Sequence, residues 1–449
     1  MNAPSLRVAI IGSGPSGLYA ADELLKAHSG AQVDMFDRLA TPGGLARFGV
    51  SPDHHQRRKI IDIYERQLFA SGRFRFFGNV EIGRDISHSE LSAHYHGIIY
   101  SSGASADRML NIPGEDLNGA VAATNFVAWY NGHPDHHRDQ YDLRGERAVL
   151  IGNGNVALDV ARMLLLPTAY LSKTDISEIA LNALAKSEIK EVVIVGRRGP
   201  AQAAFTLPEL LELKHLDIDI ELQGICDEEL NKLIAEASSR VESALRLRTL
   251  QELAKQPKRH ARKLIFRFMH SPLALLGENK VSAIQLGINT LSHDGSKALA
   301  TSETTALDTQ LVIKAIGYRG RALPELPFDA ERGILPNEAG RVSSGVYVTG
   351  WLKRGPQGVI GSNKMCSKET VASVLKDCSQ GDLKQAIDET DIATRLSKAN
   401  INYIDIKAWR QINKTECAAG LQVGKPRKKL LSHEELMQAA QPADAVAGR

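Results

Sequence analysis

The chain has 449 residues, of which 43% are hydrophobic and 24% are charged, and its net charge is +3. This is the composition of an ordinary globular protein with two or three domains. So small a net charge gives no reason to expect nucleic acid binding. No apolar run approaches the ~20 residues that cross a bilayer, so we expect no membrane insertion. No signal peptide precedes the first predicted strand, so we expect a cytoplasmic location, with an organelle after transit-peptide removal as the alternative.

A glycine-rich loop lies close to the start of the chain. The apolar run LRVAII (6–11) predicts a strand, and LYAADELLKAH (18–28) predicts a helix. Strand, glycine turn and helix in this order are typical of a dinucleotide-binding unit. We expect Gly12 to allow the tight turn, Gly14 to let the backbone approach a pyrophosphate, and Gly17 to let the helix pack closely on the strand.

The residue that ends the following strand bears on the ligand. QVDMFD (32–37) predicts this strand, and it ends in Asp37, twenty residues after Gly17. An acid at this position is placed to accept hydrogen bonds from ribose hydroxyls. The pyrophosphate would lie at the helix N-terminus, where free N–H groups and the helix dipole favour negative charge. The alternative is a structural glycine turn with an incidental surface acid.

A second loop of the same type lies in the middle of the chain. RAVLI (147–151) predicts a strand, and VALDVARMLL (156–165) predicts a helix. Gly152 and Gly154 lie between the two, and Ala157 lies in the predicted helix. Together they form a Gly-x-Gly-x-x-Ala variant of the motif. The chain therefore carries two candidate dinucleotide sites.

The second loop differs from the first in the residues that follow its next strand. EVVIVG (191–196) predicts that strand, and Arg197 and Arg198 come directly after it, beyond a long insert at 167–190. Two guanidinium groups suit a 2′-phosphate, which they can hold by charge-assisted bidentate bonds. The second site is therefore predicted to prefer NADP over NAD. A solvated arginine pair is the alternative.

The order of the predicted elements indicates an inserted domain. TQLVIKAIGY (309–318) predicts a strand that closes the second unit, and SGVYVTGW (344–351), followed by a helix in 364–377, returns the chain to the first. We predict an α/β fold with two Rossmann-like dinucleotide-binding domains, in which residues 105–318 are inserted into a discontinuous domain of residues 1–104 and 319–449. The last dozen residues are predicted to be disordered.

Cysteines and basic residues narrow the class of protein. Cys226, Cys366, Cys378 and Cys417 form no CxxC pair, which argues against a disulfide reductase and against an iron–sulfur flavoprotein. The histidines of HPDHHRD (133–139) have no Cys or Glu at ligand spacing, so we predict no metal site. Basic clusters lie at 57–59, 240–248, 255–263 and 424–429. They are either solvated faces or a docking surface for an acidic partner.

Two dinucleotide sites without a redox disulfide indicate a flavin relay, in which the first site holds FAD and the second NADP(H). Over nearly its whole length the chain resembles the adrenodoxin reductase-like ferredoxin–NADP reductases, which have the glutathione reductase type of fold. The motifs that carry the resemblance are GSGPSG (12–17), LARFGVSPDH (45–54), GNV (78–80), GNGNVALDVAR (152–162), GRRGPAQAAFTLPEL (196–210), GWLKRGPQGVI (350–360) and GKPRKKL (424–430).

The resemblance implies a set of cofactor-binding positions. On the FAD side they are Gly12, Gly14, Pro15, Ser16, Gly17, Asp37, Gly44, Leu45, Val80, Gly350, Trp351, Gly358, Val359 and Ile360. On the NADP side they are Gly152, Asn153, Gly154, Asn155, Val156, Arg197 and Arg198. His54 and Glu209 are implied as a charged pair that either orders loops or tunes the flavin. Asp159 is implied near the active site, unless it only stabilises its helix.

The implied reaction is hydride transfer between NADPH and FAD, then single-electron transfer to a ferredoxin-type iron–sulfur carrier. The resemblance implies docking of an acidic ferredoxin near Arg240, Arg246, Lys258 and Arg259. The alternatives are an FAD- and NADPH-dependent monooxygenase or oxidase and a non-catalytic redox-sensing flavoprotein.

The sequence departs from the family pattern at three places. GSNKMCSK (361–368) replaces a Thr-rich stretch, Asp37 replaces the more usual Glu, and Gly43-Gly44 stands where relatives often carry a bulkier residue.

Overall fold

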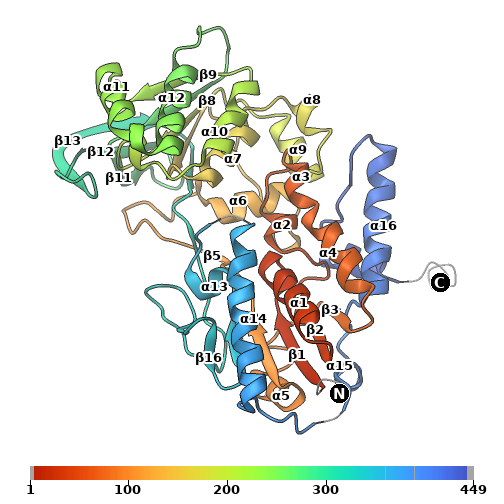
Figure 1. The fold of residues 1–449 in the computed structure, drawn as a ribbon. Helices are drawn as coiled ribbons and strands as arrows, with labels where there is room; N and C mark the ends of the chain where they lie inside the picture. Colours follow the sequence, from red (N-terminus) through yellow and green to blue (C-terminus); the bar gives the residue numbers. More distant parts are fainter. Residues whose placement is uncertain (1–4, 359, 389, 442–449) are drawn as a thin grey trace. The chain divides into compact units, whose positions relative to one another are not determined.

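The protein forms two compact units (Figure 1). The computed structural model describes residues 5–358, 360–388 and 390–441. Unit 1 comprises Met1–Ala106, Asn131–Asp135 and Tyr318–Arg449, and unit 2 comprises Asp107–Tyr130 and His136–Gly317. The chain leaves unit 1 in β5 (Ala106–Asp107) and returns to it at β15 (Tyr318–Arg319).

Asn131–Asp135 groups with unit 1, although sequence analysis assigned residues 105–318 to one domain. The reason is local bonding within unit 1. The Asn131 carbonyl accepts from Lys429 Nζ at 2.9 Å, and the Asn131 amide oxygen accepts from the Arg58 guanidinium.

Unit 1 is built on a six-stranded sheet of order β16-β17-β4-β1-β2-β3, parallel except for the antiparallel pair β16 and β17. Its strands are β1 (Leu6–Ile11), β2 (Ala31–Asp37), β3 (Phe74–Gly78), β4 (Gly97–Tyr100), β16 (Arg341–Ser343) and β17 (Val346–Val348). β17 lies beside β4, so the late strand completes the sheet that the N-terminal strands begin.

The helices of unit 1 come from both ends of the chain. They are α1 (Pro15–Ala27), α2 (Leu45–Phe48), α3 (His55–Arg58), α4 (Ile60–Phe69), α5 (His88–His94), α13 (Trp351–Arg354), α14 (Ser362–Gln380), α15 (Ile392–Lys398), α16 (Ile406–Gln422) and α17 (His433–Ala439). Figure 1 shows α1 and α14 packed along one another.

Both faces of the unit 1 sheet are buried, which explains why the sequences of its strands are almost continuously apolar. Leu6, Val8 and Ile10 point to the face covered by α1, α14 and α16, while Ala9 and Ile11 point to the opposite face.

Unit 2 contains a second six-stranded sheet, of order β6-β14-β7-β8-β10-β9, in which every described pair is parallel. Its strands are β6 (Ala120–Ala122), β7 (Arg147–Ile151), β8 (Glu191–Val195), β9 (Asp219–Gln223), β10 (Lys263–Arg267) and β14 (Leu311–Lys314). β7 and β8 are direct neighbours, with Ile151 opposite Val195. The long insert after the second glycine loop therefore does not separate the two strands in the sheet.

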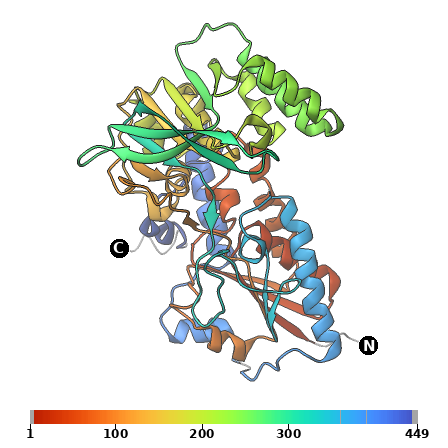
Figure 2. The ribbon, with the colours of Figure 1, turned by 90° about the vertical axis from the view of Figure 1, so that its left-hand side faces the viewer.

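Helices cover one face of this sheet and an antiparallel sheet covers the other. The helices of unit 2 are α6 (Ala123–Tyr130), α7 (Asn155–Leu165), α8 (Thr168–Leu171), α9 (Glu178–Leu184), α10 (Leu207–Glu212), α11 (Asp227–Glu236) and α12 (Val241–Ala254). The antiparallel strands, seen as one layer in Figure 2, are β11 (His270–Leu276), β12 (Ala283–Leu291) and β13 (Ala298–Asp308).

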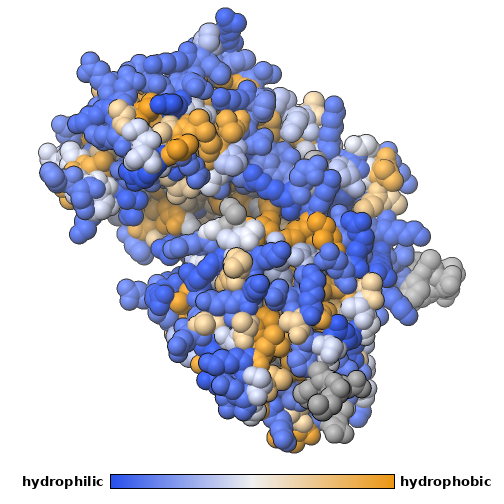
Figure 3. Space-filling model, viewed as in Figure 1, coloured by the Kyte–Doolittle hydropathy of each residue, from blue (hydrophilic) through white to orange (hydrophobic). Residues whose placement is uncertain are grey.

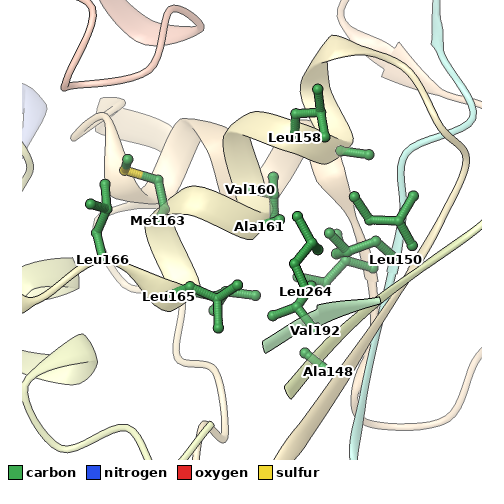
Figure 4. Close-up of a cluster of buried hydrophobic side chains, with 14 of the residues drawn as sticks. Ala148, Leu150, Leu158, Val160, Ala161, Met163, Leu165, Leu166, Val192 and Leu264 are labelled. Carbon is green, nitrogen blue, oxygen red and sulfur yellow. The ribbon is translucent and has the colours of Figure 1, made fainter. Parts of the chain in front are cut away.

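The largest apolar cluster of unit 2 joins α7 to the sheet. Leu158 and Ala161 of α7 face Leu150, Val192 and Leu264 of three neighbouring strands (Figure 4). All five side chains are 2% exposed or less, so this packing fixes α7, and with it the glycine loop that precedes it.

The predicted α/β fold class is confirmed, and the strands of both glycine motifs are observed. The predicted strands 6–11 and 147–151 are β1 and β7, and the predicted helix 156–165 lies in α7. Between β9 and β10 the chain forms the two helices α11 and α12, and α12 ends at Ala254. Residues 442–449, within the stretch predicted to be disordered, lie outside the described residues. Within those described residues, no helix is both long and apolar enough to span a membrane.

Candidate functional sites

The first glycine loop joins β1 to α1 in unit 1. Gly12 has φ of +107°, and a Cβ atom on Gly17 would lie 2.1 Å from the Gly12 carbonyl oxygen. Pro15 occupies the first turn of α1, where its missing N–H costs nothing. Gly14 caps α1 without a side-chain hydrogen bond, whereas α5 and α16 are capped by Ser87 and Asp405. The first-turn N–H groups of α1 are thus left for an anionic ligand.

A second backbone segment lies against this loop. The Gly43 N–H donates to the Ser13 carbonyl at 3.0 Å, and a Cβ on Gly44 would lie 2.9 Å from Gly14 Cα. Gly43 and Gly44 have φ of +112° and +49°. Close approach and positive φ together explain why this chain has glycine at both positions. Leu45, directly after it, begins α2 and is partly exposed.

The Asp37 carboxylate bonds back to the first loop. One oxygen accepts from the Ser13 N–H at 2.8 Å and from the Ser13 hydroxyl at 2.5 Å, and the other accepts from the Leu39 N–H at 2.9 Å. A carboxylate offers about four acceptor positions, so Asp37 keeps capacity for a ribose hydroxyl. Val80, also predicted here, is 1% exposed and donates its N–H to the Asp37 carbonyl at 2.9 Å.

Two buried hydroxyl groups beside this segment were missed by sequence analysis. Thr41 is 1% exposed and Ser51 is 0% exposed, and neither hydroxyl has a hydrogen-bond partner among the described residues. A buried polar group without a partner costs free energy, and a polar ligand removes that cost. The uncapped α1 terminus and these unpartnered hydroxyls are polar groups that a dinucleotide such as FAD can satisfy. No sequence motif marks them, because Ser and Thr are common in loops.

Residues 361–368, where the sequence departs from the family pattern, lie at the beginning of α14 and support the turn after β17. Cys366 Sγ accepts from the Gly350 N–H at 3.3 Å, and the Ser367 hydroxyl donates to the Ser16 carbonyl at 2.9 Å. A Cβ on Gly350 would lie 2.1 Å from Ser16 Oγ. The segment therefore ties the Gly350 turn to the first glycine loop within unit 1.

Trp351 begins α13, and its ring centroid lies 5.4 Å from that of Tyr318. Lys353 Nζ donates to the Thr370 hydroxyl at 3.2 Å, and the Arg354 guanidinium donates to the Asn363 amide oxygen at 2.9 Å. α13 is thus held to α14 by two basic side chains. Gly358 is exposed with φ of +82°, Ile360 is partly exposed, and Val359 lies outside the described residues.

The tail motif GKPRKKL packs into unit 1 around a buried carboxylate. Glu416 is 0% exposed and accepts from Arg47 at 2.6 and 2.8 Å and from Arg427 at 2.7 Å. Burial alone would raise the pKa of Glu416, but the two arginines lower it below its ordinary value. Lys425 and Lys429 are also buried, at 6% and 5% exposure. The interpretation of 424–429 as part of a docking surface is therefore wrong for these side chains.

The second glycine loop joins β7 to α7 in unit 2. Gly152 has φ of +113°, and Gly154 caps α7 without a side-chain hydrogen bond. The segment after β8 lies on this loop: the Asn153 carbonyl accepts from the N–H groups of Ala204 and Phe205, both at 3.1 Å. The Asn155 amide oxygen accepts from the Thr206 N–H at 2.8 Å. Val156, in the first turn of α7, packs partly buried against the core.

Arg197 and Arg198 follow β8 at the same edge of the sheet as the loop, since the Gly152 N–H donates to the Val195 carbonyl at 2.9 Å. The Arg197 backbone carbonyl accepts from the Asn289 amide at 2.9 Å. The exposed Arg197 guanidinium has no hydrogen-bond acceptor among the described residues. The Arg198 guanidinium donates to the Ser296 carbonyl at 3.1 Å. The pair is therefore asymmetric, and Arg197 is the better placed of the two to bind a ligand phosphate.

Arg162 joins the two predicted acidic residues of unit 2. It is 1% exposed, donates to Asp159 at 2.7 Å, and lies 3.6 Å from a Glu209 carboxylate oxygen. Sequence analysis missed Arg162, although its i,i+3 spacing from Asp159 is a recognisable signal. His54 is 9% exposed and belongs to unit 1. Its pairing with Glu209 of unit 2 stays a prediction.

The predicted docking residues have different environments. Arg240 and Arg259 are exposed. Lys258 is exposed, but its Nζ donates to the Ala254 carbonyl at 3.1 Å and to that of Ile220. Arg246 is partly buried, and burial lowers the pKa of its guanidinium, which Glu242 partly offsets.

Comparison with known proteins places the chain among flavin- and nicotinamide-dependent oxidoreductases. The model of the pyridine nucleotide-disulphide oxidoreductase family matches residues 6–199. The chain is 45% identical to the NADPH-ferredoxin reductase FprA of Mycobacterium tuberculosis, over 96% of this chain and 98% of that protein. It is 40% identical to the mitochondrial NADPH:adrenodoxin oxidoreductase of Arabidopsis thaliana, over 97% of this chain and 95% of that protein.

A solved structure supports the same relationship. The structure of Mycobacterium tuberculosis FprA in complex with NADPH superposes with a TM-score of 0.92 at 43% identity, covering 97% of this chain and 99% of that one. The chain belongs to the family of the NADPH-ferredoxin and NADPH:adrenodoxin oxidoreductases. The resemblance identified from the motifs is confirmed.

Proposed function

We propose that the protein is a ferredoxin–NADP reductase, in which unit 1 holds FAD and unit 2 holds NADP(H). The relatives with which it shares its family are named as NADPH-ferredoxin and NADPH:adrenodoxin oxidoreductases. Both cofactor assignments rest on the chemistry of the two loops.

One observation carries the proposal: both α1 and α7 begin behind a glycine loop with no side-chain cap, but opposite charges follow their neighbouring strands. Asp37 follows the first loop and Arg197 follows the second. An acid accepts from ribose hydroxyls, whereas a guanidinium binds a 2′-phosphate.

The residues of unit 1 have binding and orienting roles. The α1 N-terminus and the Gly44 backbone would hold the pyrophosphate of FAD, while Asp37 would accept from its ribose. Cys366 bonds to the Gly350 turn and Ser367 to the first glycine loop, so that α14 links the two. When bound, FAD supplies the conversion between a two-electron hydride donor and a one-electron acceptor.

The partner that fits this activity is an iron–sulfur protein of the ferredoxin type. We place its docking surface on unit 2, on the exposed side of α12 and the segment that follows it. The exposed Arg240 directly precedes Val241, which is 76% exposed, and Leu245 on the same helix is 47% exposed. Arg259, in the segment after α12, is a second exposed cation. Figure 3 shows hydrophobic atoms gathered among hydrophilic ones over the α10 and α12 region. An apolar centre with a basic rim fits an acidic protein.

The experiment that tests the function is NADPH-driven reduction of cytochrome c by the purified flavoprotein, with and without an added ferredoxin, at low salt. We expect a large ferredoxin-dependent increase in rate, decreasing as salt is raised, because salt screens the docking charges. A rapid NADPH oxidation that ferredoxin does not change, with oxygen consumed instead, would contradict the proposal and support an oxidase or monooxygenase.

A further inference from the structure

Arg246 lies on α12 within the basic stretch 240–248, yet its side chain points into unit 2. Its guanidinium donates to the Ala201 carbonyl at 3.0 Å and to the Phe205 carbonyl at 3.4 Å. The guanidinium carbon also lies 5.9 Å from the centroid of the Phe205 ring, which is 1% exposed. The Arg246 guanidinium therefore donates to backbone groups of its own unit, whereas Arg240 is exposed.

The two carbonyls that Arg246 binds belong to the segment that connects Arg197 to α10. This segment contains the 3₁₀ turn Pro200–Gln202 and then runs through Phe205 to Thr206. Its other side lies on the second glycine loop, through the Asn153 carbonyl and the Asn155 amide oxygen. The segment is thus held between the loop and α12.

The backbone is anchored both at Arg197 and shortly after it. Its own backbone carbonyl is anchored by Asn289, while the chain that leaves it is anchored four residues later by Arg246 at Ala201. A charge-assisted hydrogen bond to a carbonyl is stronger than a neutral one, so Arg246 is a strong support for the segment.

We propose that Arg246 is a positioning residue for recognition of the 2′-phosphate of NADP(H), and not a contact for the docking partner. It holds the segment after Arg197 on the second glycine loop, so that the Arg197 guanidinium meets the phosphate. This inference deepens the proposed function and rests on it.

Titration calorimetry tests the proposal without electron transfer. 2′,5′-ADP carries the 2′-phosphate, and 5′-AMP lacks it. We expect Arg246→Ala to weaken binding of 2′,5′-ADP about 5- to 10-fold, less than the loss of a direct charged contact would because Arg246 acts through Arg197, and to leave 5′-AMP binding unchanged. The 2′,5′-ADP affinity of Arg246→Lys should lie between those of the wild type and Arg246→Ala, since a lysine keeps the charge but lacks the fork that reaches both carbonyls.

Two controls separate positioning from folding and docking. Lys232→Ala removes an exposed cation from the neighbouring helix α11, and we expect it to leave both affinities unchanged. Flavin content and the thermal melting curve show whether each variant is folded. If Arg246→Ala does not fold, Arg246→Lys alone decides, because the proposal requires it to weaken 2′,5′-ADP but not 5′-AMP.

Three results would overturn the proposal. The first is an unchanged 2′,5′-ADP affinity together with a raised KM for ferredoxin, which would make Arg246 a docking contact. The second is equal weakening of 2′,5′-ADP and 5′-AMP, which would mean general support of the loop. The third is a wild-type protein that binds both nucleotides equally. That result would also overturn the assignment of NADP(H) to unit 2, whereas the first two leave the proposed function intact.

Discussion

The first glycine loop is hydrogen-bonded to Asp37 at the end of β2, whereas the second glycine loop is hydrogen-bonded to the chain segment that follows β8. In unit 1, Asp37 accepts two hydrogen bonds from Ser13 and so becomes part of the loop. In unit 2, Asn153 accepts from Ala204 and Phe205, and the Arg197 side chain extends outward. Two loops of closely similar sequence pattern therefore differ in which charge they leave for a ligand.

The supports behind the two loops also differ. The α2 region of unit 1 rests on a buried charge cluster, in which Glu416 binds Arg47 and Arg427. In unit 2 the segment over the loop is held through backbone groups, with Arg246 as its charged support. The basic residues near the end of the chain thus stabilise unit 1, while those at 240–259 include exposed ones. Four predictions test this difference, beginning with the largest expected effect.

Replacing Glu416 should have the largest effect. Glu416→Gln leaves Arg47 and Arg427 without a countercharge in a buried position, which costs about 3–5 kcal/mol of unfolding free energy. Urea unfolding at pH 7 measures this difference. Glu434→Gln, an exposed site on α17, is the control and should change stability by less than about 0.5 kcal/mol.

The effect of Glu416 should also depend on pH. Its pKa in the folded protein is lowered, so its contribution is complete above the unfolded-state pKa of about 4.3 and is lost as pH falls through the folded value. We therefore expect the stability difference between wild type and Glu416→Gln to decrease on acidification below about pH 4. A difference that stays constant over this range would show that the cluster acts through packing and not through charge.

Replacing the two arginines after β8 should have the next largest effect. We expect Arg197→Ala to raise the KM for NADPH about 10- to 100-fold, as for the loss of a charged phosphate contact. Arg198→Ala should raise it only a few-fold, since Arg198 also bonds to Ser296. Steady-state assays with ferricyanide measure both, and the KM for NADH should change little. Equal effects on NADPH and NADH would contradict 2′-phosphate recognition by this pair.

Reversing the exposed charges near α12 should have the smallest effect. Arg240→Glu combined with Arg259→Glu should slow ferredoxin reduction a few-fold at low salt, and the difference should vanish near 1 M salt, where the Debye length is about 3 Å. Reduction of ferricyanide should not change. Lys173→Glu with Lys280→Glu, two exposed cations outside the basic stretches, serves as the control. Equal slowing with both acceptors would point to a folding defect instead.

Much of the fold and of the loop chemistry could be predicted from local patterns. Strand, glycine turn and helix are encoded within about 20 residues. The observed bounds of β1 and β7 are those predicted, α7 begins one residue earlier than predicted, and α1 begins three residues earlier. The position of Arg197 after β8 also followed from strand order, because adjacent parallel strands end at the same edge.

The partners of individual side chains could not be predicted in the same way. Arg246 and the exposed Arg240 lie in the same basic stretch, and only the packing of α12 turns Arg246 inward. The buried hydroxyls of Thr41 and Ser51 carry no sequence signal, since burial depends on what folds over them.

The sequence by itself determined the two nucleotide motifs, the opposite charges that follow them and the family of the chain. These depend on glycine spacing, hydrophobic periodicity and residue identity, which are local properties. Only the tertiary structure decided which cations are available. Glu416 lies 369 residues after Arg47, and no local pattern reveals that a carboxylate so far along the chain takes up the charge of an arginine beside the first site.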